Sequence, residues 1–146
     1  MKRINEYKKL FGVVNEIYLK SLKTNYRDLV KEWHPDKFQD GDALKEEAEL
    51  NSRKIIDGYH FLISIAPETI AANLEEYTST INEAGIDYLQ HKGLVLEITY
   101  LDGNTYEYFG IDKKMYMKML NSGNLNRFAK RNIYIKHLYR KSKRGE

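Results

Sequence analysis

The sequence predicts an α+β fold: an antiparallel helical hairpin within a region of about four helices, followed by a small antiparallel β-meander with one helix. Apolar residues between Leu19 and Trp33 recur every three or four positions, which is typical of a helix with one buried stripe. Residues 94–100 alternate in a way that is typical of a strand. Asp102-Gly103 follows as a tight-turn signal, because glycine accepts positive φ without steric strain.

The helical half divides at a glycine and two prolines. We expect helices over residues 5–11, 18–33 and 43–65, and a short one from Pro67 to about residue 77. Gly12 stops the first. Pro35 disfavours helical geometry at His34 and therefore ends the second. Pro67 fits the first turn of the last helix, where a missing N–H is tolerated.

The second half contains strand and turn signals. We expect strands over residues 86–89, 94–100 and 105–109 and a helix over residues 113–120, which Asp112 can cap. A short linker falls within residues 78–82. The predicted organisation is therefore a helical domain over 1–77, an α+β domain over 79–141 and a basic tail over 142–146.

Composition limits the classes of function. The 146 residues are 42% hydrophobic and 31% charged, with a mean hydropathy of -0.65, and contain no cysteine. We expect a soluble, cytoplasmic protein without a secretory signal or membrane span. The absence of cysteine excludes disulfides, thiolate zinc sites and cysteine nucleophiles. His60, His91 and His137 are scattered, so we expect no metal site, and we expect no cofactor.

A candidate functional loop, His34-Pro35-Asp36, lies between the two long predicted helices. The residues around it that matter for a family resemblance are Tyr7, Leu10, Gly12, Val13, Tyr26, Arg27, Leu29, Ile55, Gly58, Tyr59 and Leu62. Together with the loop they resemble a J-domain, the module of DnaJ-type co-chaperones, over residue 7 to about residue 77. The resemblance implies that the loop and the basic face of the preceding helix bind a DnaK-type chaperone and stimulate its ATPase.

The chemistry of this loop favours binding over catalysis. Pro35 stiffens it, which lowers the entropy lost on docking, and the Asp36 carboxylate suits bidentate pairing with an arginine of a partner. His34 can donate or accept a hydrogen bond. No nucleophile or metal ligand accompanies the two polar residues, so we expect no enzyme activity.

The predicted docking helix has a basic face with two acids near it. Its cations, Lys20, Lys23, Arg27 and Lys31, recur at helical spacing. Asp28 and Glu32 should weaken attraction to an acidic partner. The chain then uses a divergent chaperone or binds with modest affinity, and the alternative is a helical half that is only structural.

The second half, residues 79–141, contains a set of short motifs. They are Ile86-Asp87-Tyr88, the strand over 94–101, Asp102-Gly103, Tyr106-Glu107-Tyr108-Phe109, Tyr116, Asn132-Ile133 and Tyr139-Arg140. With these motifs the second half resembles the KTSC domain, and the resemblance implies a module for targeting or nucleic-acid binding.

An RNA surface in this half is the alternative function. A two-residue turn at Asp102-Gly103 leaves Tyr106 and Tyr108 on the face opposite Leu96, where they can stack on bases, whereas a turn one residue longer puts them in the core. Phosphate contacts would come from the basic end of the chain, which can also be a solvated tail. The candidate residues there are Arg127, Lys130, Arg131, Lys136, Tyr139 and Arg140.

Overall fold

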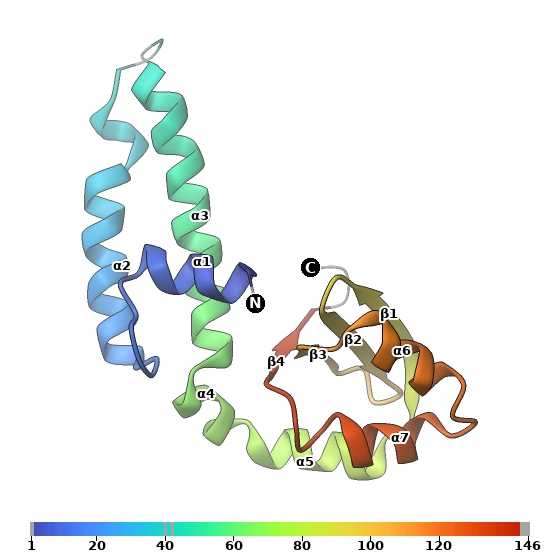
Figure 1. The fold of residues 1–146 in the computed structure, drawn as a ribbon. Coiled ribbons are helices and arrows are strands. Elements are labelled where there is room, and N and C mark those ends of the chain that lie inside the picture. Colours follow the sequence, from blue (N-terminus) through green and yellow to red (C-terminus); the bar gives the residue numbers. More distant parts are fainter. Residues whose placement is uncertain (1, 40, 42, 144–146) are drawn as a thin grey trace. The chain divides into compact units, whose positions relative to one another are not determined.

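The chain folds into two compact units. The computed structural model describes residues 2–39, 41 and 43–143 (Figure 1). One unit spans Lys2–Thr69 and the other begins at Ile70. The expected basic tail begins at Ser142, which ends the last strand, and residues 144–146 lie outside the described part. No helix among the described residues has the length and apolar character that a membrane crossing requires.

The first unit is a helical hairpin with short helices around its base. It contains α1 (Lys2–Leu10), α2 (Leu19–Trp33), the 3-10 turn η1 (Pro35–Lys37), α3 (Ala43–Ile65) and the start of α4 (Pro67–Ala72). Helices α2 and α3 run antiparallel and side by side, and α1 lies across them (Figure 1). The predicted antiparallel hairpin is confirmed.

The packing of α1 against α3 depends on Gly58. This buried glycine lies mid-helix, and a Cβ atom there would come 2.8 Å from Cδ1 of Tyr7 and 3.1 Å from Cε2 of Phe11. The Tyr7 ring also packs on Phe61, with ring centroids 5.4 Å apart. The missing side chain therefore lets the two helices approach closely.

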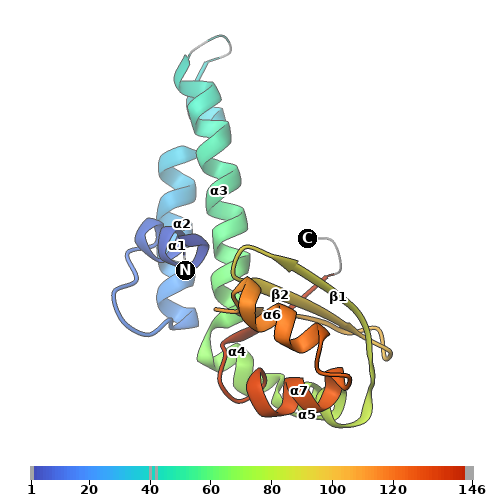
Figure 2. The same ribbon diagram turned by 45° about the vertical axis from the view of Figure 1, so that its right-hand side comes forward.

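The second unit is a four-stranded antiparallel sheet with helices on one face (Figure 2). Its elements are α5 (Leu74–Glu83), β1 (Ile86–Lys92), β2 (Val95–Tyr100), β3 (Thr105–Phe109), α6 (Lys113–Leu120), α7 (Leu125–Asn132) and β4 (Tyr139–Ser142). The strand order is β1-β2-β3-β4. The predicted α+β class and meander are confirmed, and the meander gains β4.

Three local predictions are wrong. The helix expected from Pro67 to residue 77 is two helices, which meet at Asn73, the N-cap of α5. The expected linker over 78–82 lies within α5, because Tyr77 and Thr80 are buried against the sheet and Thr80 Oγ1 donates to Asp102 Oδ2 over 2.7 Å. Only one helix was expected after β3, and the structure has both α6 and α7.

Candidate functional site

Directly after α2, residues 34–38 form a closed turn, which we call the bend. His34 ends α2 in an extended conformation, with φ -60° and ψ 126°, and Pro35 begins η1. The Lys37 N–H donates to the His34 carbonyl over 3.0 Å, and the Phe38 N–H donates to the Pro35 carbonyl over 3.1 Å. A proline-restricted turn with these bonds has few alternative conformations.

The bend presents its two polar side chains to solvent. The side chains of His34 and Asp36 are 51% and 91% exposed, with Nδ1 and Oδ2 3.7 Å apart. His34 Nδ1 accepts a hydrogen bond from the Asp36 N–H over 3.2 Å. This bond places the proton of the neutral ring on Nε2, so His34 offers a donor and Asp36 an acceptor to another molecule.

A serine of α3 fixes the point where α2 ends. Ser52 Oγ donates to the Trp33 carbonyl oxygen over 2.7 Å, which satisfies one of the acceptors that a helix end leaves open. At the other end of α2, Glu68 Oε1 accepts from the Leu19 N–H over 2.9 Å. Both ends of α2 are therefore tied to residues outside that helix.

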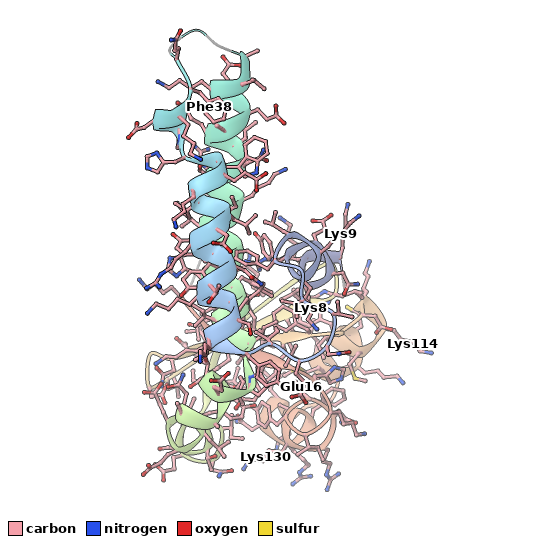
Figure 3. The ribbon with its side chains drawn as sticks, turned by 90° about the vertical axis from the view of Figure 1, so that its left-hand side faces the viewer. Lys8, Lys9, Glu16, Phe38, Lys114 and Lys130 are labelled. Atoms are coloured by element: carbon pink, nitrogen blue, oxygen red, sulfur yellow. The ribbon has the colours of Figure 1, made fainter. Side chains whose placement is uncertain are left out.

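The expected basic face of α2 faces solvent. Lys20, Lys23, Arg27 and Lys31 are all exposed, as are Asp28 and Glu32. Figure 3 shows the hairpin from the side of α2, with Phe38 just beyond the bend. The bend and this helix thus form one candidate protein-docking surface.

The turn between β2 and β3 places two candidate nucleic-acid residues in the core. Thr99 pairs with Thr105 and Ile98 with Tyr106, so the turn is one residue longer than the two-residue alternative. Tyr106 and Tyr108 consequently share the face of Leu96 and are 1% and 0% exposed. The alternative in which Tyr106 and Tyr108 stack on bases is therefore wrong, and the alternative that places them in the core is confirmed.

Tyr108 belongs to a chain of four buried tyrosine hydroxyls in the core between the sheet and the helices. Tyr77 and Tyr108 hydroxyls are 3.2 Å apart, Tyr108 and Tyr100 hydroxyls 2.8 Å apart, and Tyr100 donates to Tyr134 over 2.9 Å. Burial raises the pKa of each of these four phenols above its ordinary value. The hydrogen bonds between these four hydroxyls satisfy polar atoms in an otherwise apolar core.

Two further candidates have structural roles. The Tyr139 ring stacks on Tyr77 with centroids 3.8 Å apart, so that face is closed to a base. Arg140 is 6% exposed, and its Nη1 donates to Glu107 Oε1 over 2.6 Å. The prediction that Arg140 contacts phosphate is therefore wrong, because a buried carboxylate on the neighbouring strand binds its guanidinium.

The other four basic candidates remain at the surface. Arg127, Lys130, Arg131 and Lys136 are exposed on α7 and the segment after it. The first three border a hollow of about 330 Å³ together with Asn124 and Asn126.

Helix α6 adds cations that sequence reasoning missed. Lys113, Lys114 and Lys118 are exposed on it, and Figure 3 shows Lys114 and Lys130 extending away from the unit. The sequence feature that could have indicated these cations is the scarcity of acidic residues around them: Asp112 is the only Asp or Glu between residues 112 and 143. Within the described ranges, no three His, Cys, Asp or Glu side chains lie close enough together to bind a metal ion.

Comparison with known proteins identifies part of the chain. Residues 79–137 match the family model of the KTSC domain, as the sequence resemblance predicted for this half. No J-domain family match was found for the helical half. No curated protein matches the chain.

Proposed function

We propose that this protein is a J-domain-like co-chaperone. The bend at His34, Pro35 and Asp36 docks on a DnaK-type chaperone of the seventy-kilodalton heat-shock class and stimulates its ATPase. The KTSC domain serves as a targeting module. The observation that carries the proposal is a proline-restricted turn that holds an imidazole and a carboxylate in solvent between two antiparallel helices.

The binding chemistry follows from the geometry of the bend. Asp36 can accept two parallel hydrogen bonds from a partner arginine, and the exposed Nε2 of His34 can donate a third. Because the turn is already closed by its own hydrogen bonds, docking orders few groups. The cations of α2 speed encounter with an acidic partner.

The test is the steady-state ATPase rate of purified DnaK-type chaperones with the full-length protein. The wild type should raise the rate, and His34→Gln should abolish the increase because the substitution removes the imidazole from the bend. His60→Gln, at an exposed histidine of α3, is the matched control and should behave as the wild type. Equal rates with wild type and His34→Gln would exclude the proposal.

A second candidate function is nucleic-acid binding by the KTSC domain through its helices. The observation that favours it is the set of exposed cations on α6 and α7, in a stretch of sequence from residue 112 to residue 143 whose only carboxylate is Asp112. These cations can contact phosphates, whereas Tyr106 and Tyr108 are buried and cannot stack on bases. Binding would therefore depend on the backbone and vary little with sequence.

The corresponding test is RNA affinity measured over a range of salt concentrations. The logarithm of affinity should fall linearly with the logarithm of salt, and Lys130→Glu with Arg131→Glu should flatten the slope. Arg53→Glu with Lys54→Glu, an exposed adjacent pair on α3, is the control. A salt-independent affinity would contradict this function.

A further inference from the structure

Helices α6 and α7 both carry their cations on the side opposite the core. The cations are Lys113, Lys114 and Lys118 on α6 and Arg127, Lys130 and Arg131 on α7, and all six are exposed. The core-facing residues are Met115, Tyr116 and Met119 on α6 and Leu125, Phe128 and Ala129 on α7. At about 100° per residue, the mean direction of the cations is about 160° from that of the core-facing residues in each helix. Because α6 and α7 contact each other and pack on the same core, the six cations form one surface, which we call the cationic face (Figure 2).

The cations of this face are not paired with acids of the protein itself. In the part of the chain that the structure describes, none of the six forms an ion pair. Asp112, the nearest acid in the sequence, caps α6, where its Oδ1 accepts from the Met115 N–H over 2.8 Å. The cationic face therefore attracts polyanions, and their charge would be complementary to all six side chains at once.

The α7 part of the cationic face is hollowed. Arg127, Lys130 and Arg131 border a hollow of about 330 Å³, and its other lining residues are Asn124 and Asn126. As far as the structure describes this lining, it contains neither an apolar nor an acidic side chain. Guanidinium, ammonium and carboxamide groups all donate hydrogen bonds to phosphate oxygens. The chemistry of the hollow therefore suits a phosphate group.

The two helices, which the structure describes throughout, expose no aromatic ring on which an unpaired base could stack. Tyr116 is partly buried, and its ring stacks on His91 with centroids 4.7 Å apart. Phe128 is partly buried against the core. Proteins that bind single strands combine cations with exposed aromatic rings, and the cationic face has only the cations. A duplex keeps its bases stacked on one another and presents a higher density of phosphate charge.

We infer that the cationic face binds double-stranded nucleic acid in preference to a single strand. The inference rests on the second candidate function, nucleic-acid binding, and adds the kind of nucleic acid and the participation of α6. A membrane with anionic lipids is another polyanion that carries phosphates. Met117 and Leu120 of α6 are exposed, but α7 exposes no large apolar side chain that could enter a lipid layer, which favours the duplex.

The test compares the affinity of the full-length protein for an RNA duplex of about 20 base pairs with its affinity for each separated strand. Fluorescence anisotropy at low salt should give a Kd for the duplex at least about fivefold lower than for either strand. Lys114→Gln with Lys118→Gln should raise the Kd for the duplex by at least about threefold, because α6 then contributes fewer phosphate contacts. Arg53→Gln with Lys54→Gln makes the same change in net charge on α3 and should stay within about twofold of the wild type.

The possible outcomes separate the inference from the function on which it rests. Single strands that bind as tightly as the duplex, or an unchanged Kd for Lys114→Gln with Lys118→Gln, would overturn the inference and leave nucleic-acid binding standing. Vesicles containing phosphatidylserine that bind more tightly than the duplex would assign the cationic face to a membrane and overturn the inference. If neither the duplex nor the strands bind, both the inference and the second candidate function are overturned. Far-ultraviolet circular dichroism of each variant establishes that the helices are intact.

Discussion

Ser52 of α3 donates its hydroxyl hydrogen to the carbonyl oxygen of Trp33, the last residue of α2, over 2.7 Å. This bond joins the two arms of the hairpin next to the bend. It fixes where α2 stops and, with Pro35, the direction in which the chain leaves the helix. The proposed docking surface therefore depends on a residue of the other helix, α3.

Replacing Ser52 by alanine should destabilise the hairpin by about 1 kcal/mol, because the Trp33 carbonyl loses its side-chain donor. Urea unfolding followed by the fluorescence of Trp33, the only tryptophan, measures the change in the free energy of unfolding. Ser21→Ala, at an exposed position of α2, is the control and should have little effect. Equal effects of the two substitutions would show that the bond contributes nothing.

Gly58→Ala should lower the stability of the helical unit by about 1–3 kcal/mol. The new Cβ would come within 2.8 Å of the Tyr7 ring, and this overpacking outweighs the gain of about 1 kcal/mol in helix propensity. Thermal unfolding of Gly58→Ala and of the double variant with Tyr7→Ala measures the coupling between the two sites. The penalty should shrink in the Tyr7→Ala background, and a stabilised Gly58→Ala protein would refute the close approach.

Arg140→Gln should destabilise the second unit by about 3 kcal/mol, because it leaves the Glu107 carboxylate buried without its guanidinium. Lys143→Gln, at an exposed cation just beyond β4, should change stability by less than about 0.5 kcal/mol. Chemical denaturation of both variants, followed by circular dichroism, decides between a structural and a surface role for Arg140. A loss of stability no larger than that of Lys143→Gln would show that Arg140 has no structural role.

The buried tyrosines should make the second unit sensitive to alkali. Burial raises the pKa of Tyr106 to about 12 and those of Tyr77, Tyr100 and Tyr108 also above 10.0, the ordinary value. Because the unfolded chain loses these protons first, their contribution to stability is complete below pH 10 and is lost as pH rises toward the folded pKa values.

Absorbance of tyrosinate during an alkaline titration measures this effect. Exposed tyrosines should ionise near pH 10, and the buried tyrosines should ionise only at higher pH, together with unfolding. Titration of all 12 tyrosines of the native protein near pH 10 would contradict the buried hydroxyl chain.

Local patterns predicted the hairpin and the central strands. Residues close together in the sequence determine three features: the apolar stripe of α2, the end of that helix before Pro35, and the alternation of residues in β2. The sequence alone therefore predicts them. The sequence did not determine the pairing register of β2 with β3, because a glycine such as Gly103, with φ of 91°, fits both turn lengths considered. Only the tertiary packing of the sheet determines whether the strand face that carries Tyr106 and Tyr108 lies in the core or in solvent.

The missed elements depend on long-range contacts. Helix α7 has an N-cap, Asn124, but its eight residues lie in a basic stretch that also fits a solvated tail. Strand β4 has four residues, and its place in the sheet comes from pairing with β3, more than thirty residues earlier. For the same reason Arg140 could not be separated from the exposed cations: its partner, Glu107, is distant in sequence.

Single-turnover hydrolysis of ATP already bound to a DnaK-type chaperone is the sharpest test of the proposed co-chaperone function, because it removes nucleotide exchange from the measured rate. The wild-type protein and His60→Gln should accelerate hydrolysis equally, whereas His34→Gln and Asp36→Asn should leave it at the basal rate. Acceleration that survives substitution of both His34 and Asp36, or a wild-type protein that leaves the basal rate unchanged, would contradict it.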